Sequence, residues 1–246
     1  MSGNGSQHPG VSSGATVGLI VPPASGAMPP DVAAMYPGLR FEVVGLGLPE
    51  MSEAGYSQAV GRVAECSAEL AARGAAAIFM YGTSLSFFRG ATYNGELEEI
   101  MADAAGVPAA TLTSALTGAM RGVGLRRLAV ATAYTDEVNR LFRAYFEAEG
   151  FEIASLNGMN IAALTGVDGV GDEAIAALAG KSLDAAPGAD GIVISCAGLI
   201  TAGIAPKLER RFGLPVLSSS MVGAWAAARL GGHSGAAPGM GRLYEG

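Results

Sequence analysis

Two segments of the sequence place reactive side chains at the end of an apolar run. "VISCAGLITAG", residues 193–203, has Cys196 directly after a predicted buried strand, and "YGTSLS", residues 81–86, brings hydroxyls and backbone N–H groups to a second strand end. A thiol can transfer a proton when its surroundings tune its pKa, and a turn rich in hydroxyls and N–H groups can hold a carboxylate. A turn whose Thr and Ser only cap the next helix would give the same pattern.

Tyr134 follows another predicted strand in "ATAYTDEVN", residues 131–139. Its phenol is either a neutral donor at a ligand site or a packing group. Asp136 and Glu137 stand in the first turn of the predicted helix that follows, where negative charge is favourable, so we interpret them as structural.

The two histidines give Cys196 no partner for nucleophilic catalysis. His8 lies in the N-terminal arm and His233 in the glycine-rich segment "LGGHSGAAPG". Neither has the spacing of a metal ligand or of a triad base, and the chain has no cysteine cluster for zinc. We therefore expect no metal, and proton transfer is the better role for the thiol. Cys66, within a helical pattern, is interpreted as a packed residue.

Composition excludes several classes of protein. Half of the 246 residues are hydrophobic and 15% are charged, which suits a globular chain. The formal charge is −7, and the scattered arginines form no basic stripe for nucleic acid. No apolar run approaches the roughly 20 residues of a membrane helix, and the start lacks the pattern of a secretory signal. We expect a soluble, cytoplasmic, monomeric protein without nucleic-acid or membrane partners.

Short apolar runs alternate with helical patterns along the whole chain. Near-continuous apolar strands separated by helices are typical of parallel sheets covered on both faces, and hence of an α/β fold. Neither a P-loop nor a dinucleotide fingerprint is present, so no nucleotide is implied. The predicted strands are residues 16–21, 41–47, 75–80, 107–111, 127–132, 151–156, 191–195 and 215–218.

The order of segments also repeats, with an offset of roughly 110 residues. "GVPAATLTSAL" resembles "GLPVLSSSMVGA", and "AAIFMYGTS" resembles "DGIVISCAG". We infer two similar lobes related by a pseudo-twofold axis, each with a parallel four-stranded sheet flanked by helices. Strand ends of both lobes would line one cleft, with Cys196 opposite its counterpart Gly82. The expected divisions are an N-terminal disordered arm, two lobes and a C-terminal segment, at residues 1–14, 15–115, 116–230 and 231–246.

Several segments together resemble one known family. "VPPASG", "YGTSLSFFRG", "RRLAVATAYTDEVN", "DGIVISCAGL", "PVLSSS" and "PGMGRLYEG" are similar to the arylmalonate decarboxylases of the aspartate/glutamate racemase superfamily, which includes maleate cis-trans isomerases. The resemblance runs from about Val17 to the C-terminus. It implies enantioselective, cofactor-free decarboxylation of 2-aryl-2-alkylmalonates to 2-arylpropionate-type acids, through an enediolate that a cysteine protonates.

The resemblance also implies roles for particular residues. Cys196 would deliver the proton, and Thr83, Ser84 and Tyr134 would bind the retained carboxylate and the enediolate. Ala197, where the family has a glycine, would keep the backbone donor after the cysteine. The substrate pocket would be formed by Gly82, which leaves space for the aryl group, and by Pro22, Pro23, Leu48, Met51, Leu164 and Val167. An apolar wall of this kind desolvates the departing carboxylate.

Two other functions remain open on the sequence alone. A racemase or maleate isomerase of the same superfamily would use a cysteine in each lobe, and Gly82 supplies no second acid or base. A non-catalytic carboxylate-binding protein would use the same cleft, with Cys196 as a small packed residue.

Overall fold

Eight parallel strands form two separate sheets in the computed structural model, which describes residues 14–245. All eight predicted strands are present, with ends within two residues of the predicted ones. The predicted N-terminal arm lies outside the described residues apart from Gly14. The strands are β1 (Val17–Val21), β2 (Phe41–Gly45), β3 (Ala77–Met80), β4 (Ala109–Thr111), β5 (Arg127–Thr132), β6 (Glu152–Gly158), β7 (Gly191–Ser195) and β8 (Val216–Ser218).

The two sheets have the same topology. Their strand orders are β2-β1-β3-β4 and β6-β5-β7-β8, and every neighbouring pair is parallel. The central strands β1 and β7 are buried along their whole length, whereas most of the edge strand β2 is only partly buried. The repeat in the sequence is therefore a repeat of sheet topology, and the predicted α/β class is confirmed.

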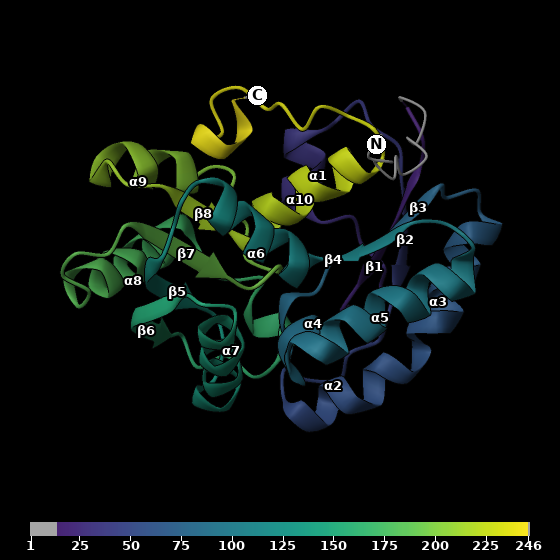
Figure 1. Ribbon diagram of the computed structural model, residues 1–246, viewed down its shortest axis with the longest axis horizontal. Coiled ribbons are helices and arrows are strands. Elements are labelled where there is room, and N and C mark those ends of the chain that lie inside the picture. The colour runs from purple at the N-terminus through teal and green to yellow at the C-terminus, as the bar shows by residue number, and fades with distance from the viewer. Residues whose placement is uncertain (1–13, 246) are drawn as a thin grey trace, which may run out of the picture.

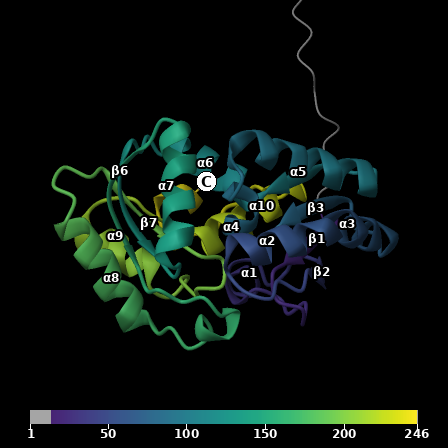
Figure 2. The same cartoon turned by 90° about the horizontal axis from the view of Figure 1, so that it is seen from below.

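Helices cover both faces of each sheet, as Figures 1 and 2 show from two directions. The stretch from Glu53 to Ala72 is interrupted by one 3-10 turn, Val60–Arg62, between α2 and α3. The helices are α1 (Pro30–Met35), α2 (Glu53–Ala59), α3 (Val63–Ala72), α4 (Thr83–Phe87), α5 (Gly90–Ala105), α6 (Leu112–Gly122), α7 (Asp136–Ala148), α8 (Asp172–Asp184), α9 (Ala205–Phe212) and α10 (Ser219–Leu230).

Equivalent positions in the two halves end one helix and begin the next. Gly106 ends α5 and Gly213 ends α9, both in the left-handed conformation with φ of 66° and 68°, which glycine adopts without steric cost. A three-residue strand follows each, and the hydroxyls of Thr111 and Ser218 then cap α6 and α10 by accepting a backbone N–H bond. The shared "G-x-P" pattern thus encodes a helix stop, an edge strand and a helix start.

The two halves are joined through helices at their centre. In Figure 1, α6 and α10 lie between the sheets, and α10 packs against α6, α1 and β1. The expected division at residues 115 and 116 falls inside α6.

The C-terminal segment packs back on the protein, with Tyr244 buried and the Tyr36 hydroxyl donating to the Gly235 carbonyl. Among the described residues, no helix has both the length and the apolar character needed to cross a membrane.

Candidate active site

A cavity of about 530 Å³ opens where strands of both sheets end. Its wall includes residues that directly follow the central strands β1, β3 and β7, and Tyr134, just beyond β5. In each sheet the strand order reverses between these central strands, β1 and β3 in one and β5 and β7 in the other. Ligands of open α/β sheets bind at such reversal points. The cavity also has the size of a small-molecule site.

The structure brings all the predicted site residues to this one cavity. Cys196 and Ala197 lie at the end of β7, while Thr83 and Ser84 begin α4 after β3. The other predicted residues that line the cavity are Tyr134, Gly82, Pro22, Pro23, Leu48, Met51, Leu164 and Val167. Residues from both halves of the chain therefore share one site.

Cys196 combines burial with an unusual backbone conformation. Its side chain is 6% exposed, and its φ is 152°, a value that L residues rarely adopt. Such strain costs roughly 1–3 kcal/mol and is typical of functional sites. Burial raises the pKa of the thiol to about 11, although backbone N–H groups of Gly198 and Leu199 partly oppose this by favouring the thiolate. The thiol is consequently protonated at neutral pH.

The turn after β3 leaves a buried hydroxyl free. Gly82, not a hydroxyl residue, is the N-cap of α4, and no side chain caps this helix. Thr83 is 2% exposed, and its Oγ1 has no hydrogen-bond partner among the described residues. A buried hydroxyl without a partner is unfavourable unless a ligand supplies one. The alternative that Thr83 and Ser84 only cap the next helix is therefore wrong.

Tyr134 is a buried residue in the wall of the cavity. The side chain is 1% exposed, its ring packs edge-on against Phe87 with centroids 6.0 Å apart, and its hydroxyl oxygen lies 3.3 Å from that of Ser195. Burial raises the pKa of this phenol well above its ordinary value. Tyr134 is thus a neutral donor. The following helix is capped by Thr135, with Asp136 and Glu137 in its first turn, as the sequence predicts.

The small residues of the site allow close packing. A Cβ atom at Gly82 would lie 2.8 Å from Cδ1 of Leu85 and 3.3 Å from Cγ of Pro22. A Cβ atom at Gly198 would lie 3.1 Å from Cγ1 of Val167. Ala197 does not have a positive φ, so alanine fits there without strain, and the unusual conformation falls on Cys196 instead.

Part of the cavity wall was not predicted from the sequence. Most residues of the proline-rich segment "PPASGAMPP", residues 22–30, line the cavity, although only its first two prolines were predicted to do so. Its cluster of prolines and small residues directly after a strand was the available signal. The other unpredicted lining residues are Val21, Ser25, Ala27, Met28, Pro29, Pro30, Tyr81, Thr165, Asp168, Gly198 and Ile200.

Tyr56 of α2 was also missed. Its hydroxyl is buried beside Ser84 and close to Cys196. Burial raises the pKa of this phenol, so it too is a neutral group.

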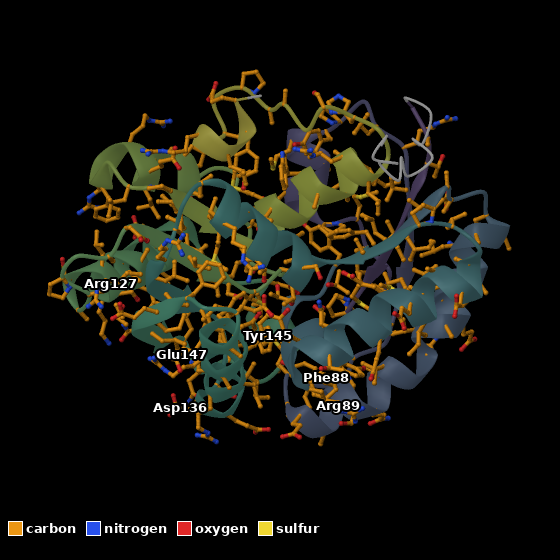
Figure 3. The ribbon with its side chains drawn as sticks, in the orientation of Figure 1. Phe88, Arg89, Arg127, Asp136, Tyr145 and Glu147 are labelled. Atoms are coloured by element: carbon orange, nitrogen blue, oxygen red, sulfur yellow. The ribbon has the colours of Figure 1, made fainter. Side chains whose placement is uncertain are left out.

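The electrostatic character of the cavity is nearly neutral. Among the described residues that line it, none is Lys, Arg or His, and Asp168 is the one charged group. Other charged side chains, such as Arg127 and Asp136, lie toward the outside of the molecule (Figure 3). Within residues 14–245, no cluster of three or more His, Cys, Asp and Glu side chains could hold a metal ion. An anion bound here would be held by hydroxyl and N–H donors.

This fold and site define a class of α/β proteins that place a cysteine at a cavity shared by two similar sheets. Maleate cis-trans isomerase from Nocardia farcinica, solved bound to TRIS, has a similar fold, with a TM-score of 0.84 and 25% identity over 94% of this chain and 97% of that one. The family model described as arylmalonate decarboxylase matches residues 17–244. The chain belongs to the arylmalonate decarboxylase family.

Individual relatives agree with this assignment. Arylmalonate decarboxylase from Bordetella bronchiseptica is 41% identical over 231 residues, which cover 94% of this chain and 96% of the relative. A liganded arylmalonate decarboxylase with one glycine-to-cysteine and one cysteine-to-serine substitution has a TM-score of 0.91 and 39% identity, over 94% of this chain and 99% of that one.

Proposed function

We propose that this protein decarboxylates 2-aryl-2-alkylmalonates, without a cofactor, to one enantiomer of a 2-arylpropionate-type acid. The observation that carries the proposal is a buried, protonated Cys196 thiol at a largely apolar cavity whose hydroxyl groups are neutral donors. Family membership supports the reaction class. Thr83, Ser84, Tyr134 and Ala197 bind the carboxylate that the product retains.

The retained carboxylate binds at the turn after β3. Four groups in the cavity wall act as neutral donors. They are the free Oγ1 of Thr83, the hydroxyls of Tyr134 and Ser84, and the backbone N–H of Ala197. These groups hold one carboxylate and then stabilise the negative charge that develops on it as the enediolate. Because the surrounding protein already holds them in place, little reorganisation is needed during the reaction.

The other carboxylate departs from an apolar environment. Pro22, Leu48, Met51, Leu164 and Val167 offer no donor side chain, so a carboxylate against them loses its hydration without compensation. The bond between this carboxylate and the α-carbon breaks, neutral carbon dioxide leaves, and the electron pair enters the enediolate of the retained carboxylate. The aryl group lies on the side of Gly82, where no Cβ intrudes.

Cys196 completes the reaction by general acid catalysis. Its S–H bond breaks as the α-carbon takes the proton, and the product is released as a monocarboxylate. The thiolate that remains accepts hydrogen bonds from the Gly198 and Leu199 backbone and recovers its proton from water. A proton delivered from one face gives one enantiomer.

The two alternatives are less well supported. Racemases and isomerases of this superfamily need a second acid or base opposite the first cysteine, and Gly82 has no side chain. A purely binding protein would not need the strained backbone of Cys196. We further propose, from the composition, that the enzyme is a cytoplasmic monomer that acts on a free small molecule and uses neither nucleic acid nor membrane as a partner.

Incubation of the purified protein with phenylmalonate in chelator-treated buffer tests the function. Carbon dioxide release and formation of phenylacetate, followed by gas analysis and chromatography, should occur without any addition. 2-Methyl-2-phenylmalonate should give 2-phenylpropionate of one handedness. No release from any aryl- or alkenylmalonate, together with tight binding of phenylacetate, would favour the binding protein instead.

A further inference from the structure

One buried carboxylate has no part in the proposed decarboxylation. Asp31, in the first turn of α1, is 1% exposed. It accepts hydrogen bonds from the backbone N–H of Thr201 at 2.9 Å, the N–H of Ala202 at 3.1 Å, the Thr201 hydroxyl at 2.8 Å and the Ser220 hydroxyl at 2.5 Å. None of these donors is a lysine, arginine or histidine. A carboxylate buried among neutral donors is costly to maintain unless all its lone pairs are used.

These donors tie together three segments that are far apart in the sequence. Thr201 and Ala202 belong to the loop that begins with Cys196, and Ser220 lies in the first turn of α10. Asp31 itself directly follows Pro29 and Pro30, which line the cavity. Figure 1 shows α1 beside α10, and the two helices pack together. One side chain therefore connects the proline-rich wall of the cavity to the loop that carries the thiol.

The corresponding loop in the first half is held differently. After β3, the hydroxyls of Ser86 and Thr113 bond to the carbonyl of Thr83 at 3.1 and 2.8 Å, so residues of the same half fix that turn. The loop after β7 forms no α-helix until Ala205. Its side-chain ties to the rest of the protein meet at Thr201, whose hydroxyl lies 2.5 Å from that of Ser218 and 2.7 Å from that of Ser220. Asp31, on the opposite half, accepts the backbone N–H bonds of Thr201 and Ala202 as well.

We propose that Asp31 is a positioning residue, which holds the loop of residues 197–202 so that the strained Cys196 presents its thiol to the substrate's α-carbon. This role rests on the decarboxylase function proposed for the chain. A backbone with φ of 152° persists only where its surroundings constrain it, and the loop's own bonds are few: Leu199 N–H to the Cys196 carbonyl, and Ile204 and Ala205 N–H to the Thr201 carbonyl. Asp31 fixes Thr201, whose carbonyl accepts the last two of these bonds.

The consequence of losing this tie is a misplaced proton donor. In Asp31→Asn, the amide keeps the volume of the side chain but turns an NH2 group toward backbone N–H groups of the loop, which can only donate, so their bonds to this side chain are lost. The loop then loses its defined position, and a shift of about 1 Å at a reacting group can reduce the rate on the order of 10²-fold. We expect kcat to fall between about 10- and 100-fold, KM to change less than about threefold, and the enantiomeric purity of the 2-phenylpropionate to drop.

The matched control is Asn94→Ala. Asn94 is 4% exposed and bonds to Thr111 and Ser114, at the start of α6 and away from the cavity. This variant loses stability through a similar buried polar network, and we expect unchanged kcat and unchanged handedness. All rates are measured where denaturation curves show full folding. If Asp31→Asn does not fold, Ser220→Ala and Thr201→Val remove single partners of the same carboxylate and decide the question.

Alkylation of Cys196 by iodoacetamide tests the positioning role of Asp31 independently of decarboxylase activity. The reaction is followed residue by residue with mass spectrometry. A released loop exposes the thiol, so Asp31→Asn should alkylate at least about threefold faster than the parent even if the parent decarboxylates nothing. With an active parent, kcat and product handedness unchanged in Asp31→Asn, or reduced no more than in Asn94→Ala, would overturn the positioning role. With an inactive parent, an unchanged alkylation rate would overturn it.

Discussion

At the residue scale, the proposed decarboxylation depends on a thiol that keeps its proton. Cys196→Ser preserves size but replaces the thiol by a much weaker acid. General acid catalysis contributes about 10²–10⁴-fold, and kcat on phenylmalonate should fall by a factor in this range. Cys66→Ser changes the other buried cysteine, in α3, and should leave kcat unaltered. A Cys196→Ser variant with the parent's kcat would remove Cys196 from proton delivery.

Burial of the same thiol predicts how the stability of the protein and the alkylation rate of Cys196 depend on pH. An ordinary cysteine has a pKa of 9.0, and burial raises that of Cys196 to about 11, so the folded protein retains the proton between these values while the unfolded chain loses it. The contribution of this thiol to the free energy of unfolding is complete below pH 9 and is lost as the pH rises toward 11. Iodoacetamide alkylation of Cys196 should therefore rise about tenfold per pH unit through about pH 9.5. A plateau near about pH 8.5, the ordinary range of a free thiol, would contradict the raised pKa.

At the scale of the element, the turn from β3 into α4 holds a residue whose substitution should lower turnover without lowering stability. Thr83→Val replaces a buried hydroxyl that has no partner among the described residues, so the free energy of unfolding should stay equal or rise slightly. Turnover should nevertheless fall, by about the 10²–10³-fold typical of a lost oxyanion donor. Thr117→Val is the matched control, because the Thr117 hydroxyl in α6 is buried in the same way but lies outside the cavity. Equal kcat in both variants would show that Thr83 binds no substrate.

At the scale of the whole molecule, the two sheets place Gly82 and Cys196 at equivalent strand ends on one cavity. Gly82→Cys combined with Cys196→Ser should then deliver the proton to the opposite face of the α-carbon. Chiral chromatography of the 2-phenylpropionate should show inverted handedness, at a lower rate because the new Cβ must displace Cδ1 of Leu85, 2.8 Å away. Gly82→Cys alone should slowly racemise the product. An active double variant that retains the parent's handedness would mean that these positions do not face each other.

Local patterns were sufficient to predict much of the fold. Each strand is a short apolar run bounded by helix signals, and burial on both faces of a parallel sheet makes such runs continuous. The repeated "G-x-P" segments around Gly106 and Gly213 therefore predicted matching strands in both halves. Because ligand sites of such sheets lie at strand ends, the sequence pattern was also enough to place Cys196, Gly82 and Thr83 at one site.

The sequence by itself determined which residues stand at the strand ends, since that depends on neighbours in the chain. The tertiary structure decided what those residues can do. The raised pKa of Cys196 comes from burial by both halves, and its strained φ needs a loop fixed from elsewhere. The carboxylate of Asp31 reaches Thr201 across 170 residues of sequence. No local pattern encodes such a contact, because the free energy that fixes it arises only when distant segments pack together.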